Sequence, residues 1–332
     1  MQEPANEGGL YAGFCAIVGL PNVGKSTLIN KILGEHLAAV SAKPQTTRDR
    51  ILGIHRVERV EPEVAGATGV EGAIARPAQI AFVDTPGLQD GKGALRRYMR
   101  DEAISAAADC DVVLLMIDAS DRSGRMPSRL REEDAAPIAT AVANHPTIVA
   151  LNKIDRVAKP DLLPLMQAWG DELPGVEVVP ISAATGEGIA HLEAAIARRL
   201  PVGPALFPDG MVTDRSQQFI AREIIREQLY HQLGKELPYA CAVMIESWNE
   251  RPSKGDVAIG ALIVVERESQ KPIVVGRGGQ RIRELGIAAR AALGEALRRT
   301  VHLSLFVRVE EEWSRGEAGL RRLGYASESG QS

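Results

Sequence analysis

The sequence of 332 residues has few cysteines and no long apolar run. Its three cysteines, Cys15, Cys110 and Cys241, are far apart and stand mostly in apolar surroundings. Their number and spacing exclude a disulfide framework and a zinc cluster and favour a reducing compartment. The apolar runs at 112–117 and 259–265 are far shorter than the roughly 20 residues that cross a bilayer. The polar, acidic start does not resemble a signal peptide, so we expect a soluble, cytoplasmic protein.

A strong net charge is absent as well. The formal net charge is −4, which does not indicate a nucleic-acid-binding protein, although a basic face can still exist locally. The hydrophobic content of 45% and the charged content of 25% are typical of globular proteins. The length predicts roughly two domains, each large enough for a core of its own.

A glycine-rich turn between an apolar run and a helical pattern is the most informative stretch. It fits G-x-x-x-x-G-K-[ST] and consists of Gly19, Leu20, Pro21, Asn22, Val23, Gly24, Lys25 and Ser26, followed by Thr27. In such a P-loop, glycines let backbone N–H groups point at phosphates, the lysine reaches the β- and γ-phosphates, and the serine hydroxyl binds Mg²⁺. The alternative is a chance glycine turn, but the expected strand before it and helix after it favour nucleotide binding.

A second motif, Asp84, Thr85, Pro86 and Gly87, follows the apolar run 80–83. In this Asp-x-x-Gly pattern the carboxylate holds Mg²⁺, here through water, and the glycine N–H senses the γ-phosphate. By itself the pattern is also a common turn. Leu88 follows where Ras-type proteins have the glutamine that orients the attacking water, and its side chain forms no hydrogen bond. Hydrolysis must therefore rely on the P-loop and Mg²⁺ or on an external group, and we expect slow turnover.

Two further motifs predict which base is bound; they consist of Asn152, Lys153 and Asp155 and of Ser182, Ala183 and Ala184. The Asp155 carboxylate can accept hydrogen bonds from guanine N1 and N2, whereas adenine offers no matching donors. We expect Asn152 and the Lys153 stem to pack on the base edge and the P-loop. The Ser-Ala-Ala motif would offer a backbone N–H to guanine O6; the alternative is a strand-to-helix turn with a serine N-cap.

The loop before the second expected strand contains Gln45, Thr46, Thr47, Arg48 and Asp49. A switch threonine in this loop completes the Mg²⁺ shell when the triphosphate is present, and we favour Thr47 for that role. An ordinary polar loop is the alternative. Because the motifs occur together in the expected order, the sequence predicts a GTP-binding protein.

No residue is a certain catalytic group, and the candidates are Thr47, Gly87 and Asn22. Asn22, together with backbone carbonyls of the switch loop, could hold a monovalent cation near the β- and γ-phosphates. This hypothesis predicts that K⁺ accelerates turnover and Na⁺ does not. In the alternative interpretation Asn22 only stabilises the loop.

Short β-branched runs alternate with longer amphipathic segments, which predicts an α/β P-loop domain with a mainly parallel six-stranded sheet and helices on both faces. Strands are expected near 14–18, 49–57, 79–83, 111–117, 146–151 and 176–180, and helices near 25–34, 94–107, 130–143, 160–170 and 188–199. We expect a disordered leader at 1–12, the nucleotide-binding domain at 13–200 with a mobile inserted loop at 58–78, and a linker at 201–214.

A smaller α+β domain is expected at 215–326, followed by a tail at 327–332. Its elements have the order α-β-β-α-α-β of a type II KH domain. Its two successive helices flank Gly276, Arg277, Gly278 and Gly279, and Lys271, Arg281 and Arg283 surround this loop. KH domains clamp about four single-stranded nucleotides at such a loop. The alternative is a helix–turn–helix corner with a solvated basic face.

With these motifs, the sequence over about 13–326 resembles the Era family of bacterial Ras-like GTPases of ribosome assembly. Further runs that carry the resemblance are 213–217, 223–227, 236–239, 286–290 and 323–325. The resemblance implies GTP, GDP and Mg²⁺ as ligands. It also implies binding of the 3′ end of small-subunit ribosomal RNA and of the pre-30S particle, and, in some members, peripheral contact with the cytoplasmic membrane. The sequence departs from the family in a longer 58–78 segment and in a clamp loop without lysine before its last glycine.

Our main prediction is a monomeric GTPase switch coupled to an RNA-binding KH domain. GTP would order residues 45–50 against the second domain and expose its RNA groove. One alternative is a nucleotide-gated RNA-binding scaffold whose hydrolysis is incidental. The other is a membrane-recruited signalling GTPase that binds no RNA.

Overall fold

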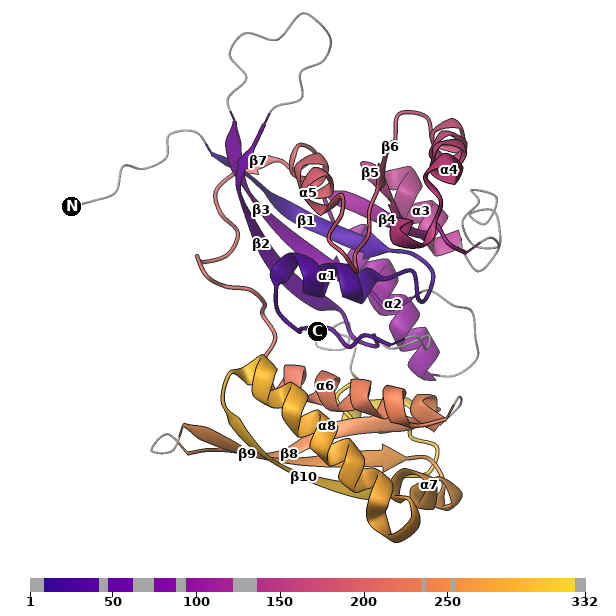
Figure 1. Ribbon diagram of the computed structural model, residues 1–332, viewed down its shortest axis with the longest axis vertical. Helices are drawn as coiled ribbons and strands as arrows, with labels where there is room; N and C mark the ends of the chain where they lie inside the picture. The colour runs from indigo at the N-terminus through magenta and orange to yellow at the C-terminus, as the bar shows by residue number, and fades with distance from the viewer. Residues whose placement is uncertain are drawn as a thin grey trace, which may run out of the picture. The chain divides into compact units, whose positions relative to one another are not determined.

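The computed structural model describes residues 9–41, 47–61, 75–87, 94–121, 136–234, 237–251 and 255–325. These residues form two compact units (Figure 1). The first unit contains the described residues of 1–34, 50–89 and 103–214, and the second contains those of 35–49, 90–102 and 215–332. This grouping differs from the expected domains. Residues 35–49 and 90–102 were expected in the nucleotide-binding domain, but they belong to the second unit, together with the C-terminal residues.

The first unit is built on a sheet with the strand order β2-β3-β1-β4-β5-β6. The strands are β1 (Leu10–Val18), β2 (Ile51–Val60), β3 (Arg76–Asp84), β4 (Val112–Asp118), β5 (Thr147–Asn152) and β6 (Glu177–Pro180). All neighbouring pairs in this order are parallel except β2 and β3. The predicted mainly parallel sheet is confirmed, and the short β7 (Val202–Gly203) adds an antiparallel strand beside β1.

Helices cover both faces of this sheet. They are α1 (Lys25–Leu33), the second part of α2 (Ala94–Ala108), α3 (Ala136–Asn144), α4 (Lys159–Glu172) and α5 (Ile189–Ala197), with a 3-10 turn, η3 (Ile154–Arg156). On one face, Val113 and Leu115 of β4 pack with Ile138 and Trp169 from α3 and α4. Leu114 and Met116 point the other way along the strand and are also fully buried. Burial on both sides explains why β4 is a continuous apolar run.

Several boundaries in the first unit differ from the expected ones. Residues 10–12, expected in a leader, begin β1, and Tyr11 pairs with Ala78 of β3. The expected insertion at 58–78 is shorter, because 58–60 belong to β2 and 76–78 to β3. Residues 62–74 lie outside the described part, so their mobility stays a prediction, as does a helix at 130–135.

The expected linker at 201–214 is part of the first unit. The Gln79 side chain accepts hydrogen bonds from the backbone N–H groups of Leu206 and Phe207 at 2.7 and 2.9 Å. Further along, the Ile54 N–H donates to the Val212 carbonyl at 2.8 Å. The segment pairs its backbone groups with β2 and β3, a long-range arrangement that its prolines and glycines did not reveal.

The second unit has a three-stranded sheet in the order β10-β9-β8, with β10 parallel and β8 antiparallel to β9. Its elements are α6 (Gln217–Gln232), η4 (Leu237–Ala240), β8 (Cys241–Arg251), β9 (Asp256–Val265), η5 (Glu268–Gln270), α7 (Lys271–Val275), η6 (Arg277–Gly279), α8 (Gln280–Leu297), β10 (Thr300–Val309) and α9 (Glu317–Arg322). The predicted α-β-β-α-α-β order is confirmed by α6, β8, β9, α7, α8 and β10. The helix α9 was not predicted.

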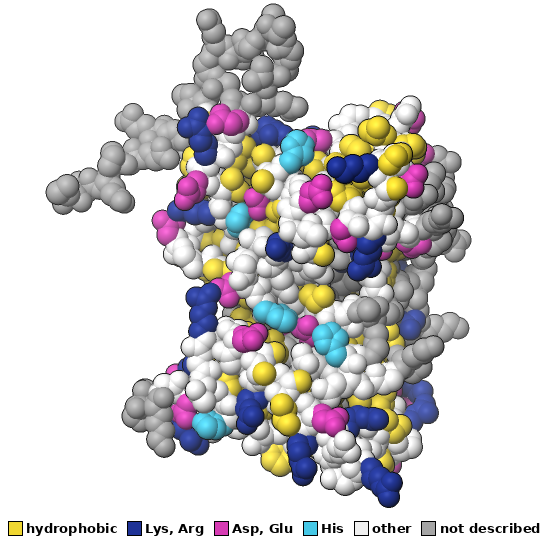
Figure 2. All heavy atoms as spheres, viewed as in Figure 1, with side chains coloured by type: hydrophobic (Ala, Val, Ile, Leu, Met, Phe, Trp, Pro, Cys, Tyr) yellow, Lys and Arg dark blue, Asp and Glu magenta, His cyan; other side chains and the backbone are white. Residues whose placement is uncertain are grey.

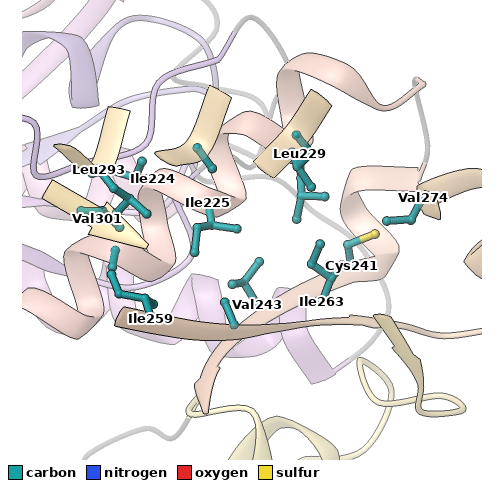
Figure 3. Packing of buried hydrophobic residues seen from close by; sticks show 14 of the residues in the cluster. Ile224, Ile225, Leu229, Cys241, Val243, Ile259, Ile263, Val274, Leu293 and Val301 are labelled. Atoms are coloured by element: carbon teal, nitrogen blue, oxygen red, sulfur yellow. The ribbon is translucent and has the colours of Figure 1, made fainter. Parts of the chain in front are cut away.

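Two apolar clusters hold the second unit together. Figure 3 shows the first, in which Ile225 and Leu229 of α6 lie against Val243 and Ile263 of the sheet. The second covers the opposite face of the sheet. It consists of Ala94, Leu95, Met99, Ala242, Leu262, Val264, Trp313, Leu320, Leu323 and Tyr325. The first turns of α2 therefore contribute to the core of the second unit. Among the described helices, none is long and apolar enough to cross a bilayer.

Candidate nucleotide and nucleic-acid sites

The P-loop joins β1 to α1 with a backbone that only small residues permit. Gly19 and Gly24 have φ values of 152° and 103°. A Cβ at Gly19 would lie 2.5 Å from the Met116 carbonyl oxygen, and one at Gly24 would lie 2.3 Å from Asn152 Nδ2. The loop therefore has the form in which backbone N–H groups at the start of a helix are available to an anion.

Lys25, at the first position of α1, is a buried cation in this loop. Its Nζ donates to the carbonyl oxygens of Gly19 at 3.0 Å and Leu20 at 3.1 Å. Burial lowers the pKa of Lys25 to about 8, and the carboxylate of Asp84 opposes this shift. An entering phosphate would stabilise the charged form of Lys25, so the site is complementary to an anion.

The side chains expected at magnesium meet at the ends of β3 and the P-loop. Ser26 Oγ donates to Asp84 Oδ2 at 2.8 Å, and Asp84 is fully buried. Thr85 Oγ1 donates to the Ile17 carbonyl at 2.8 Å, which fixes the start of the loop after β3. A Cβ at Gly87 would lie 2.9 Å from Pro21 Cα, so the backbone at Gly87 lies against the P-loop. A hydroxyl and a carboxylate are hard oxygen ligands that fit Mg²⁺.

The motifs after β5 and β6 are tied to the P-loop by the Asn152 side chain. Asn152 Nδ2 donates to the Val23 carbonyl at 2.7 Å, and its Oδ1 accepts from the Ala183 N–H at 2.9 Å. Asp155 Oδ1 accepts from Ser182 Oγ at 2.6 Å. The structure thus brings both base-recognition motifs and the P-loop together at one end of the sheet.

Lys153 has a partner that sequence reasoning missed. Its backbone is left-handed (φ 66°), and its Nζ donates to the Asn22 carbonyl at 2.7 Å and to Asp118 Oδ2 at 2.6 Å. Asp118 ends β4, next to the end of β5. Its place after a buried apolar run is the same signal that identified Asp84, and it could have been found in that way.

Only some of the expected switch residues lie in the part of the chain that the structure describes. Gln45, Thr46 and Leu88 lie outside the described residues. Thr47, Arg48 and Asp49 are described and belong to the second unit rather than to the unit of the P-loop. The roles of Thr47 as a magnesium ligand and of Asn22 at a monovalent cation stay predictions.

The glycine loop of the second unit lies between α7 and α8. Gly276, Gly278 and Gly279 have φ values of 75°, 59° and 76°. A Cβ at Gly276 would lie 2.7 Å from Arg281 Cβ, whereas no described atom lies within 4 Å of one at Gly278 or Gly279. The tip of the loop is therefore open to an approaching backbone.

Basic side chains surround the open loop. Lys271, Arg277, Arg281 and Arg283 are exposed, and Figure 2 shows Lys and Arg side chains over the α7 and α8 end of this unit. Arg281 also has a structural role, because its Nη1 donates to the Ile273 carbonyl at 2.6 Å. Ile273 of α7 is an exposed apolar side chain near the loop, and Ile287 of α8 is exposed as well.

Known protein families match both units. A family described as "50S ribosome-binding GTPase" matches residues 14–153, and the KH domain family matches residues 236–314. The GTPase Era of Geobacter metallireducens is 42% identical over 314 residues, which cover 95% of this chain and 97% of the relative. The GTPase Era of Pasteurella multocida is 42% identical over 331 residues, which cover 98% of this chain and 99% of the relative.

Two solved structures match nearly the whole chain. One is an Aquifex aeolicus Era variant bound to GDP·AlF₄⁻, with a TM-score of 0.83 and 36% identity, covering 96% of this chain and 100% of the other. The second is Era in complex with MgGDPNP and nucleotides 1506–1542 of 16S ribosomal RNA. It has a TM-score of 0.82 and 36% identity, with the same coverage of both chains.

Proposed function

Since the chain belongs to the Era family of GTPases, we propose that it binds the 3′ end of small-subunit ribosomal RNA. We propose further that GTP controls this binding and that the protein assists assembly of the 30S subunit. Its reaction is the hydrolysis of GTP to GDP and phosphate, with Mg²⁺ as cofactor.

One observation carries this proposal. A single chain combines a P-loop unit, in which Lys25, Asp84 and Asn152 converge, with a KH unit whose glycine loop is open at Gly278. The Era structure with MgGDPNP and a 16S ribosomal RNA segment shows that a relative of the same architecture holds both kinds of ligand.

The residues of the first unit provide binding and charge stabilisation rather than covalent chemistry. Lys25 and the backbone N–H groups after Gly24 would hold the phosphates, and Ser26 and Asp84 would hold Mg²⁺, directly and through water. When bound there, Mg²⁺ would neutralise negative charge on the phosphates. Because Leu88 cannot orient water, we propose that the intrinsic reaction is slow.

We further propose that a monovalent cation near Asn22 raises the rate of hydrolysis. The Asn22 backbone is left-handed (φ 64°), and Asn22 is an exposed residue of the P-loop. Single-turnover hydrolysis in KCl should exceed that in NaCl, and Asn22→Ala should remove the difference. Equal rates in the two salts would contradict a K⁺ site.

The resemblance supports three more proposals about the setting in which the protein works. We propose that it is a monomer, that it binds the pre-30S particle, and that it is cytoplasmic with peripheral contact with the membrane. Sedimentation of the purified chain and flotation with anionic liposomes, each with GDP and with a GTP analogue, test the first and last of these.

The central experiment measures binding of a labelled single-stranded oligonucleotide with the sequence of the 3′ end of small-subunit ribosomal RNA. It is run with GDP and with a non-hydrolysable GTP analogue, at two salt concentrations. Tighter binding with the GTP analogue is expected, and the affinity should fall with salt because the arginines meet phosphates. Binding that ignores the nucleotide would mean two independent modules, and no binding would favour a protein or membrane partner.

The loop offers a matched pair of variants for this experiment. Gly278 lies in the left-handed region with no described atom near its Cβ position, and both Asn and Asp tolerate this backbone. Gly278→Asp places a negative charge where a phosphate must approach, and Gly278→Asn adds almost the same volume without charge. We expect Gly278→Asp to lose at least about tenfold more affinity than Gly278→Asn, consistent with repulsion of a phosphate.

A further inference from the structure

The carboxylate of Asp118 lies at the end of β4, beside the expected guanine-recognition motif of the same unit. The strands β4 and β5 are parallel neighbours, and Asp118 pairs in register with Asn152. The Ala119 N–H donates to the Asn152 carbonyl at 2.9 Å, so the two strands stay joined to their last residues. Asp118 therefore lies at the end of the sheet where Asn152 ties the base-recognition motifs to the P-loop.

The turn after β4 fixes the direction of the Asp118 carboxylate. Its Oδ1 accepts from the Ser120 backbone N–H at 2.9 Å and from the Ser120 hydroxyl at 2.6 Å. An aspartate that accepts from the N–H two residues later forms an Asx turn, which restrains its side chain. Its other oxygen, Oδ2, accepts from Lys153 Nζ at 2.6 Å. One oxygen is thus held by the turn, and the other holds the lysine.

Lys153 is fixed between Asp118 and the P-loop in a conformation that is costly for a lysine. Its backbone is left-handed (φ 66°, ψ 34°), which costs a residue with a side chain about 1 kcal/mol. Fixing a lysine side chain also removes up to about 2 kcal/mol of conformational entropy. Its Nζ donates to the Asn22 carbonyl at 2.7 Å as well as to Asp118. These two bonds to the ammonium offset the costs.

The ion pair between Asp118 and Lys153 is partly shielded from water. The two side chains are 16% and 23% exposed. A hydrogen bond between charged groups is stronger than one between neutral groups, and salt screens it less when the groups are partly buried. Removing the carboxylate therefore takes the charged partner from a half-buried ammonium and leaves it against the Asn22 carbonyl.

The position of Lys153 connects the two parts of the nucleotide site. Its stem is expected to pack on the base, and its ammonium is bonded to the loop that is expected to hold the phosphates. We infer that Asp118 is a positioning residue for nucleotide binding, which holds Lys153 where the stem can lie on guanine while the ammonium stays on the P-loop. Asp118 stands outside the sequence motifs, and it has this role only if the chain binds GTP at this site, as proposed above.

A role of Asp118 in the turn alone is the competing explanation, and a double-mutant cycle separates the two. Asp118→Asn keeps the shape of the side chain and an oxygen for Ser120 but removes the charge. Lys153→Met removes the ammonium and keeps an unbranched stem. If Asp118 acts through Lys153, then Asp118→Asn weakens GDP binding when the lysine is present and has little effect beside methionine. A role in the turn alone gives the same loss in both backgrounds.

Asp111 provides a matched control at the other end of the same strand. It immediately precedes β4, is partly buried, and accepts from the Phe14 N–H at 2.8 Å through Oδ2. Asp111→Asn is the same chemical change, and the asparagine keeps a carbonyl oxygen for the Phe14 N–H. We expect its GDP affinity to stay within about twofold of the wild type.

The experiment measures the affinity for GDP, the rate of GDP dissociation and thermal unfolding on the full chain. A fluorescent GDP analogue that is displaced by unlabelled GDP gives the first two. For Asp118→Asn we expect an affinity about five- to tenfold lower, mostly through faster dissociation, because the lost bond is between charged groups but is partly exposed. In the Lys153→Met background the same substitution should change the affinity by less than about twofold.

Wild-type affinity in Asp118→Asn would overturn the inference, as would an equal loss with and without Lys153 or an equal loss in Asp111→Asn. If Lys153→Met binds GDP too weakly to measure, Asp118→Glu decides. Glutamate restores the charge, whereas asparagine is closer to aspartate in size and suits the turn better. Tighter GDP binding by Asp118→Glu than by Asp118→Asn supports positioning, and weaker or equal binding overturns it. If the wild type binds no GDP, the nucleotide site itself is wrong, which is a different result from normal binding by Asp118→Asn.

Discussion

The two glycine loops differ in what surrounds them. In the P-loop, a Cβ at Gly24 would lie 2.3 Å from Asn152 Nδ2, so the loop is packed against its own unit. In the KH loop, no described atom lies within 4 Å of a Cβ at Gly278. The first loop is therefore held in its binding shape by protein contacts, and the second leaves its free side to the ligand. A small nucleotide needs a preformed cradle, whereas a nucleic-acid backbone needs an unobstructed approach.

The second unit buries residues from two earlier segments of the chain. One face of its sheet covers the start of α2, and its buried polar groups hold Arg48 and Asp49. Of these residues, Arg48 and Asp49 come from the loop in which the sequence predicts a nucleotide switch. The unit with the open glycine loop is therefore also the unit that holds residues 48 and 49 of the expected switch loop.

The largest effect is expected for Gly24→Ala. The left-handed backbone (φ 103°) and the contact with Asn152 both oppose a side chain there. We expect GDP affinity to fall by at least about 100-fold, or about 3 kcal/mol. Gly175→Ala is the control, because Gly175 also has a positive φ of 82° but has no described atom near its Cβ position. GDP binding by fluorescence titration should be normal in this control; a comparable loss would mean that general destabilisation explains the result.

A smaller effect is expected from alanine in the KH loop, and only at one of two positions. Gly276 (φ 75°, ψ 169°) lies in a region that is essentially restricted to glycine, and its Cβ would lie 2.8 Å from the Arg281 backbone nitrogen. We expect Gly276→Ala to lower oligonucleotide affinity by about tenfold and Gly278→Ala by less than about threefold. Equal losses at both positions would contradict this ranking, because a methyl group on the open side of Gly278 would then weaken binding as much as the strain at Gly276.

The crowding at Gly24 can be tested by a double-mutant cycle with Asn152→Ala. Asn152→Ala alone should weaken GDP binding, because it removes the bonds to Val23 and Ala183. In that background Gly24→Ala should cost about 1 kcal/mol less than in the wild type, since the clashing amide is gone. Additive losses would mean that backbone strain, and not the contact with Asn152, makes alanine unfavourable at Gly24.

The P-loop could be predicted from the sequence because its geometry depends on neighbouring residues. The apolar run of β1, the positions of Gly19 and Gly24, and the helix from Lys25 all lie within one short stretch. The guanine-recognition motifs were found for the same reason, since each follows a buried strand of a parallel sheet. Parallel strands bring their carboxyl ends to one edge, so local patterns were enough to predict which residues meet.

The placement of residues 47–49 of the expected switch loop could not be predicted in this way. In the sequence Arg48 is a charged residue in a polar loop, and the two hydroxyls to which it donates belong to Tyr230 and Tyr325, 182 and 277 positions later. Nothing near Trp313 or Tyr325 in the sequence indicates that they would enclose a guanidinium group. Likewise, β7 has only two residues and becomes a strand because β1 offers a free edge there. Such features depend on tertiary contacts that sequence periodicity does not record.

The smallest effect is expected in the segment that follows α1, where His36 Nε2 lies 2.6 Å from Glu227 Oε2 of α6. The hydrogen bond to Glu227 raises the pKa of His36 above its usual 6.5, although burial opposes the shift, and Glu227 and Glu295 add favourable charge. Because the folded-state pKa is raised, this stabilisation is fully present below pH 6.5 and is lost as the pH rises through the raised value. The urea midpoint of the wild type should therefore exceed that of Glu227→Gln most at low pH, with the difference shrinking above pH 6.5.

The control is Arg298→Gln, which removes the exposed ion pair with Glu35 on the same segment. Its small cost in stability should not change over this pH range, because arginine stays charged. A constant difference for Glu227→Gln would show that the stabilisation by Glu227 does not depend on the charge of His36.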